Sequence, residues 1–106
     1  HIVNVTGGTV KVDDSDINPM TYHLGQNYPN PFNPESVIEF SIPVSEFVIV
    51  SIYDLKGRLV KHLNRGYLDK GIHKIVVNDV GLKSGIYYYQ IKTENFIRTR
   101  KMTFLK

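Results

Sequence analysis

The sequence of 106 residues contains no cysteine. Disulfides, a thiolate nucleophile and cysteine-ligated zinc are therefore excluded together. The chain also lacks a run of eighteen apolar residues, the length typical of a transmembrane helix, and its first residues show no signal-peptide pattern. Because it starts at His1 rather than methionine, we expect it to be a piece of a longer polypeptide whose targeting signal lies upstream. The length predicts one domain with a core of its own.

Patterns for metal binding and catalysis are missing as well. Three aspartates within residues 13–16 lack the glycine and distal glutamate of a calcium loop, so a solvated linker is the favoured interpretation over a calcium site. No nucleophile with a base and no pair of carboxylates forms a recognisable catalytic set, so we expect no enzyme. The four histidines do not have metal-ligand spacing: His1, His23, His62 and His73.

No segment has a helical period, whereas alternation with a period of two runs through most of the chain. Residues 36–42, 46–54, 59–63, 72–78, 86–92 and 96–105 are expected to be strands, with 46–54 central because both of its faces are apolar. Residues 1–12 are expected to form a small hairpin or the end of a preceding module. We therefore predict an all-β protein, an immunoglobulin-like antiparallel β-sandwich of about seven strands.

Residues 24–34, LGQNYPNPFNP, stand out ahead of the first long strand. The prolines exclude both a helix and a central strand here, and Asn30 and Asn33 can close Asx turns. Tyr28 and Phe32 are large apolar rings that a simple spacer would not need. We expect a rigid, extended segment whose two rings are received by the domain downstream.

Charge is distributed unevenly. Residues 1–54 hold one basic and seven acidic side chains, whereas residues 55–106 hold twelve basic and three acidic ones. Arg98, Arg100, Lys101 and Lys106 follow one another near the end with no acid between them. Either these cations decorate solvent-facing strands, or the last strand docks on an acidic partner surface by adding to its sheet. Nucleic acid is disfavoured as a partner because the cations are not interleaved with aromatics in a known module.

Several blocks, taken in order and spacing, resemble the C-terminal sorting domain of the bacterial type IX secretion system. They are residues 24–34 (LGQNYPNPFNP), 36–43 (SVIEFSIP), 52–60 (IYDLKGRLV), 71–73 (GIH), 81–91 (GLKSGIYYYQI) and 101–106 (KMTFLK). The similarity covers residues 22–106. Residues 1–21 lie outside it, and we expect them to be a linker or the end of a preceding module.

The resemblance implies that the domain is a sorting signal and not an enzyme. Family members occupy the C-terminus of secreted proteins from Bacteroidetes and direct a covalently linked upstream cargo through the periplasm and outer membrane to the cell surface or medium. A translocon and its shuttle protein recognise the domain, and a sortase-like peptidase removes it. No cofactor is implied.

The resemblance also assigns residues. Translocon recognition is expected at Gly81, Ser84, Gly85, Tyr87, Lys101, Met102, Phe104, Leu105 and Lys106. Structural motifs are expected at Pro29, Asn30, Pro31, Phe32, Asn33, Pro34, Tyr53, Asp54, Gly57 and Gly71.

An immunoglobulin-like accessory or carbohydrate-binding module is the alternative, which predicts a flat strip of exposed aromatics or a calcium site. Tyr87, Tyr88 and Tyr89 could stack on a sugar, but alternation sends neighbours to opposite faces, so we expect two core rings and one exposed ring. His73, which shares a face with Ile75 and Val77, is expected to be a hydrogen-bonded core residue.

Overall fold

The computed structural model describes residues 2–5, 8–11, 20–32, 34–78 and 81–106. Every regular element in these ranges is a β-strand, so the described residues offer no helix that could cross a membrane. The strands are β1 (Ile2–Val5), β2 (Gly8–Lys11), β3 (His23–Leu24), β4 (Glu35–Ile42), β5 (Glu46–Tyr53), β6 (Leu59–Leu68), β7 (Gly71–Asn78), β8 (Gly85–Lys92) and β9 (Ile97–Phe104).

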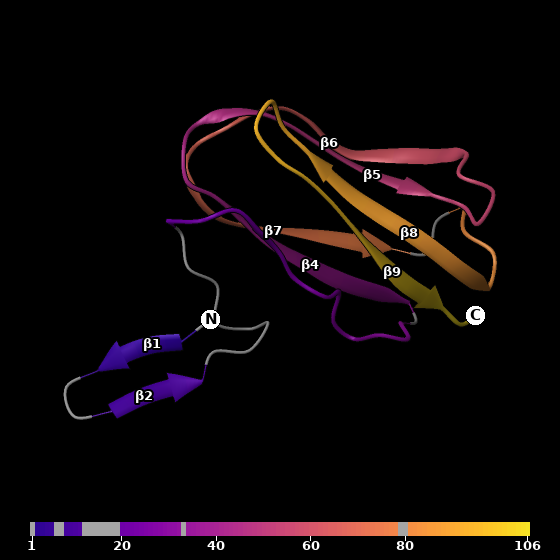
Figure 1. Cartoon of the computed structure of the whole chain (residues 1–106). Coiled ribbons are helices and arrows are strands. Elements are labelled where there is room, and N and C mark those ends of the chain that lie inside the picture. Colours follow the sequence, from indigo (N-terminus) through magenta and orange to yellow (C-terminus); the bar gives the residue numbers. More distant parts are fainter. Residues whose placement is uncertain (1, 6–7, 12–19, 33, 79–80) are drawn as a thin grey trace.

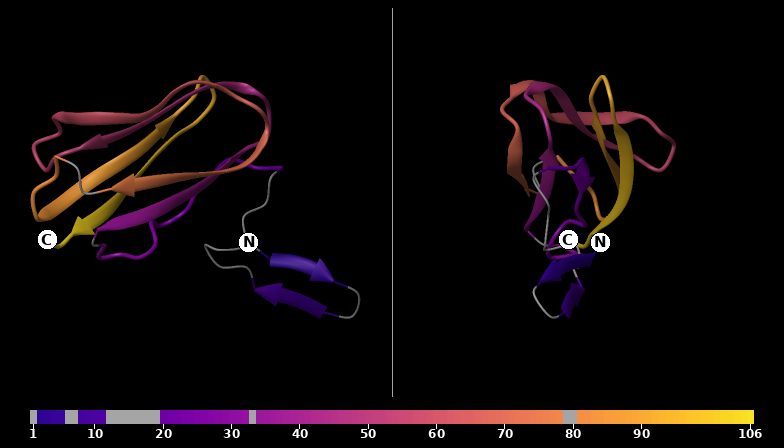
Figure 2. Two further views of the ribbon diagram at one scale, coloured as in Figure 1. Left: turned by 180° about the vertical axis from the view of Figure 1, so that it is seen from behind. Right: turned by 60° about the vertical axis from the view of Figure 1, so that its left-hand side comes forward.

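Seven strands, β3 to β9, form two antiparallel sheets (Figures 1 and 2). One sheet has the order β3-β4-β7 and the other the order β6-β5-β8-β9. The predicted all-β, immunoglobulin-like sandwich is thus confirmed, and β5 is a central strand as expected. Strands β1 and β2 pair with each other as the small hairpin that residues 1–12 suggested. The aspartates of the proposed linker lie outside the described residues.

Side-chain alternation determines which face of each sheet enters the core. Ile38, Phe40 and Ile42 of β4 are fully buried, as are Val48, Val50 and Ile52 of β5. From β8, Tyr89 and Ile91 are fully buried and Tyr87 nearly so, whereas Tyr88 is only half-buried on the other face. The period of two in the sequence therefore predicts the core faces of β4, β5 and β8 correctly.

Strand β6 is longer than the sequence indicated. We predicted residues 59–63, but the strand continues to Leu68 because its second half pairs with β5 from Glu46↔Leu68 to Val50↔Asn64. Gly66 in this half lowers the local strand propensity, yet pairing with Val48 holds it in the sheet. Register shifts next to Ser51 and Tyr53 interrupt the alternation of β6.

Candidate functional site

Four of the sequence motifs meet at one end of the sandwich, the right-hand end in Figure 1. We call it the motif end and define it by residues 28–32, 54–58, 81–87 and 104–106. Successive strands from β4 to β9 run in alternate directions, so every second connection returns to the same end. The same alternation places Gly71, which follows the β6–β7 turn, at the opposite end.

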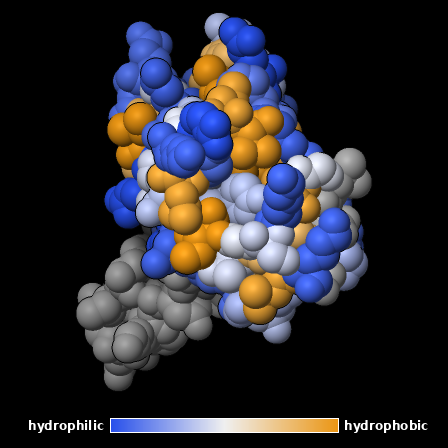
Figure 3. Space-filling model, turned by 90° about the vertical axis from the view of Figure 1, so that its right-hand side faces the viewer, coloured by the Kyte–Doolittle hydropathy of each residue, from blue (hydrophilic) through white to orange (hydrophobic). Residues whose placement is uncertain are grey.

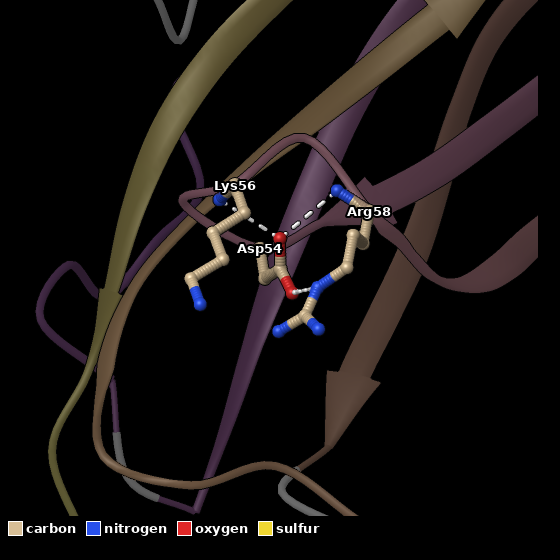
Figure 4. Close-up of polar contacts among 3 residues, drawn as sticks. All are labelled: Asp54, Lys56 and Arg58. Carbon is tan, nitrogen blue, oxygen red and sulfur yellow. Dashed lines mark hydrogen bonds and ion pairs between the residues drawn. The ribbon is translucent and has the colours of Figure 1, made fainter.

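The turn between β5 and β6 is built around Asp54 (Figure 4). The amides of Lys56 and Arg58 each donate to Asp54 Oδ1 at 2.9 Å, and Arg58 Nε donates to Oδ2 at 2.8 Å. Gly57 has φ 81°, a conformation that favours glycine. The backbone hydrogen bond from Arg58, together with the Arg58 side chain and the Lys56 amide, lowers the pKa of Asp54 although partial burial opposes this. This carboxylate holds the turn closed and keeps Lys56 and Arg58 on the surface.

The loop before β8 is anchored by Tyr87. Its hydroxyl donates to the Lys83 carbonyl at 2.7 Å and accepts from the Lys83 amide at 3.1 Å. Leu82 is buried, while Gly81 and Gly85 take positive φ angles of 79° and 154°. The position of this loop is therefore fixed by a side chain of the following strand.

Strand β9 and the 81–87 block lie next to each other. Gly85 pairs with Phe104 and Tyr87 with Met102, and the Lys106 amide donates to Ser84 Oγ at 2.8 Å. Within residues 101–106 two kinds of side chain are interleaved. Met102 and Phe104 are fully buried, whereas Lys101, Leu105 and Lys106 are exposed.

Residues 24–34, which we call the proline segment, pack against β9 through Phe32. Phe32 is 1% exposed, and its ring lies 5.0 Å from that of Phe104, measured between centroids. Asn27, also buried, donates through Nδ2 to Ser36 Oγ at 3.0 Å and to the Pro29 carbonyl at 3.1 Å. The peptide bonds before Pro29 and Pro31 are cis.

Two expectations for this segment need correction. We expected both rings to be received by the domain, but Tyr28 is 79% exposed, because its backbone pairs with Val37 at the rim of the smaller sheet. Asn30 was expected to close an Asx turn on its own backbone. Its Oδ1 instead accepts from the Thr103 amide at 3.0 Å. Pro34 is exposed ahead of β4, and Asn33 lies outside the described residues.

The surface of the motif end carries both hydrophilic and hydrophobic side chains (Figure 3). A shallow hollow of about 240 Å³ lies between the Asp54 turn and the start of β8, lined in part by Leu55, Lys56 and Ile86. Of the four cations of the last strand, Lys101 and Lys106 are exposed in this half. Arg98 lies over the Phe96 ring at 5.8 Å, and Arg100 Nε donates to the Leu24 carbonyl at 2.7 Å. Arg98 is also exposed, and it lies near the start of β9 whereas Lys106 follows its end, so docking of all four cations on one partner surface stays a prediction.

Elsewhere the polar contacts support the fold. His73 Nε2 lies 2.6 Å from the Asp69 carbonyl and the ring stacks on Phe40, so His73 is hydrogen-bonded as predicted but only half-buried. The sequence did not predict a contact between Ser51 and His62. Ser51 Oγ lies 2.8 Å from His62 Nδ1. Ser51 is buried beside a register shift, so this pair is a cross-strand contact rather than an exposed nucleophile. The part of the chain that the structure describes has no group of three or more His, Asp or Glu side chains placed to hold a metal ion.

Comparison with known proteins gives one family. Residues 26–104 match the family model described as the secretion system C-terminal sorting domain. No curated protein matches the chain. The matched range contains the proline segment from residue 26 onward, the Asp54 turn, the 81–87 loop and all of β9.

Proposed function

This chain belongs to the family of type IX secretion system C-terminal sorting domains, and on that premise we propose that the motif end is the surface that an outer-membrane translocon reads. The family is a class of sorting signals and not a class of enzymes. A protein that carries such a signal is a secreted or surface-exported protein.

The observation that carries the proposal is the interleaving along residues 101–106. The inward side chains of Met102 and Phe104 complete the core, which leaves Lys101, Leu105 and Lys106 to face outward beside the 81–87 loop. The same stretch thus stabilises the fold and presents a surface to a partner. Cations at the rim of such a surface chiefly accelerate association with an acidic partner.

The proposal includes a route. A separate signal peptide takes the parent protein to the periplasm, a shuttle protein and the translocon receive this domain, and a sortase-like peptidase cleaves it from its cargo. Residues 22–106 form the signal, and residues 1–21 connect it to what precedes. These steps follow from the family's role.

An export assay tests the proposal. A fluorescent reporter with an N-terminal signal peptide is fused to residues 20–106 and produced in a bacterium with a type IX system. Deleting residues 101–106 would be a poor test, because it removes two fully buried side chains and with them the fold. The better variant is Lys101→Glu with Lys106→Glu, which reverses two exposed charges and should leave stability nearly unchanged.

We expect export of the unaltered fusion and a several-fold fall for the double variant. The matched control is Lys70→Glu with Lys92→Glu, which reverses two exposed charges at the opposite end of the sandwich and should be exported normally. Retention of the unaltered, folded fusion in the periplasm would refute the sorting role. Equal export of both double variants would show that the translocon does not recognise the charges of Lys101 and Lys106.

The carbohydrate-binding alternative gains no support from the described residues. Phe47 and Tyr67 meet edge to face, with an interplanar angle of 89°, instead of forming a flat strip. Tyr28 is exposed on the other sheet.

A further inference from the structure

The two edges of β9 are occupied differently. One edge pairs with β8 over the whole strand, from Gly85↔Phe104 to Lys92↔Ile97. The other edge is the outer edge of the four-stranded sheet. Thr103 directs both of its backbone groups outward, since its amide donates to Asn30 and its carbonyl accepts from Phe32. Alternation along an antiparallel strand then directs the backbone groups of Lys101, Thr99 and Ile97 outward as well.

The proline segment covers half of this outer edge. Phe32 donates to the Thr103 carbonyl at 3.0 Å and accepts from the Leu105 amide at 3.1 Å. Asn30 Oδ1 accepts from the Thr103 amide at 3.0 Å, and Gln26 Nε2 donates to the Lys101 carbonyl at 2.8 Å. In the other half, none of the described residues bonds the outward backbone groups of Ile97 and Thr99.

This cover differs from a paired strand. Pro29 and Pro31 have no N–H, so the segment cannot form a continuous ladder with β9. Two of its four hydrogen bonds come from side chains, those of Gln26 and Asn30. Tyr28 to Pro31 are exposed, and among residues 28–32 only Phe32 is inserted into the core.

An extended strand would fit the edge better than the proline segment does. It could bond Ile97 and Thr99, which are open, and then continue along Lys101 and Thr103 in place of Gln26 and Asn30. Unpaired sheet edges are the usual sites for such strand addition. Addition beyond Thr99 requires the proline segment to leave.

We propose that residues 26–32 are a latch. The latch covers the outer edge of β9 from Lys101 to Leu105 until an extended strand of the secretion machinery displaces it. This regulation rests on the proposed function, because it concerns the edge of the stretch that the translocon is proposed to read. The partner is an extended chain that enters at Ile97 and Thr99.

Hydrogen exchange on the full chain tests the latch directly. The variant Gln26→Ala with Asn30→Ala removes both side-chain bonds. We expect the protection of the Thr103 and Leu105 amides to fall about tenfold, while the amides of Met102 and Phe104, which face β8, keep theirs. The control is Gln90→Ala, which removes an exposed side-chain bond to Thr99 Oγ1 on the same sheet and should leave all four amides unchanged.

Two exchange results would overturn the latch. Unchanged protection at Thr103 and Leu105 would mean that the segment does not hold the edge. An equal fall at all four amides would mean that the segment opens only with the whole fold.

The reporter fusion supplies a second readout. The latch variant should be exported at least as fast as the unaltered fusion, and slower export of the folded variant would contradict the latch. Failure of the unaltered fusion to be exported counts against the proposed function instead. The exchange experiment decides about the latch in either case, because it does not depend on export.

Discussion

At the scale of single residues, the hydroxyl of Tyr89 joins the proline segment to the centre of the larger sheet. It donates to the Gly25 carbonyl at 2.6 Å and accepts from the Asn27 amide at 2.8 Å, in a fully buried position. Tyr89→Phe would leave both backbone groups buried without this partner. We expect a loss of about 1–3 kcal/mol in the free energy of unfolding, measured by urea denaturation.

Tyr88→Phe is the matched control, since Tyr88 is half-buried on the other face of the same strand and should cost little. Equal losses for the two variants would mean that the hydroxyl of Tyr89 has no special role.

The carboxylate of Asp54 gives stability a dependence on pH. Its pKa in the folded chain lies below the usual 3.8, chiefly because the Arg58 amide donates to it. A pKa lowered by folding contributes stability that is fully present above the unfolded value and is lost as the pH falls through the folded value. We expect Asp54→Asn to be slightly less stable than wild type at neutral pH. This difference should vanish once the pH is below the lowered pKa, as urea midpoints across acidic pH would show. A difference that persists in acid would assign the effect to turn geometry instead of charge.

Residue-scale prediction from the sequence failed where prolines interrupt the alternation. Tyr28 and Phe32 are both large rings in the same motif, yet one is exposed and the other buried. In a strand, side chains at alternate positions point to opposite faces, which would have assigned a face to each ring. This alternation does not continue across Pro29 and Pro31. The same break hid the partner of Asn30, which lies seventy-three residues away on β9.

At the scale of elements, Phe32 is the apolar anchor of the proline segment. Phe32→Ala removes a ring that is 1% exposed and packs on Phe104. We expect it to lower the free energy of unfolding by about 3–5 kcal/mol, because the ring leaves a cavity between the two sheets. Tyr28→Ala, in the same segment but 79% exposed, should change it by less than about 0.5 kcal/mol. Similar urea midpoints for the two variants would contradict the asymmetry between the rings.

Elements whose signal is local were predictable, and those set by pairing were not. β4, β5 and β8 carry their own alternation, so their bounds and core faces follow from their residues. The second half of β6 has no such signal, and it is a strand because β5 beside it is long. Propensity is a weak guide wherever a neighbour supplies the hydrogen bonds.

At the scale of the whole molecule, the meeting of the motifs follows from strand direction. Once residues 36–105 are taken as strands that alternate in direction, residues 28–32, 54–58, 81–87 and the end of β9 must share one end, and Gly71 must lie at the other. The general location of the site can therefore be predicted from the sequence. The sequence does not predict the contacts of the proline segment with β9, which depend on which strand becomes the outer one.

The contacts of the described residues also indicate where the folding unit begins. Every buried residue that the structure describes lies between Leu24 and Phe104, and just before them Tyr22 stacks on Phe96 at 4.8 Å while the Thr21 carbonyl accepts from Ser41. Residues 20–106 should therefore unfold at the same urea concentration as residues 1–106.

A chain that begins at residue 26, where the family match starts, should lose about 2–5 kcal/mol. It lacks the buried Leu24 side chain and the Gly25 carbonyl that accepts from Tyr89. If residues 1–106 proved clearly more stable than 20–106, the first nineteen residues would belong to the folded domain and not to a connection with the cargo. If 26–106 matched both, the segment before the match would be dispensable and the boundary would lie where the family begins.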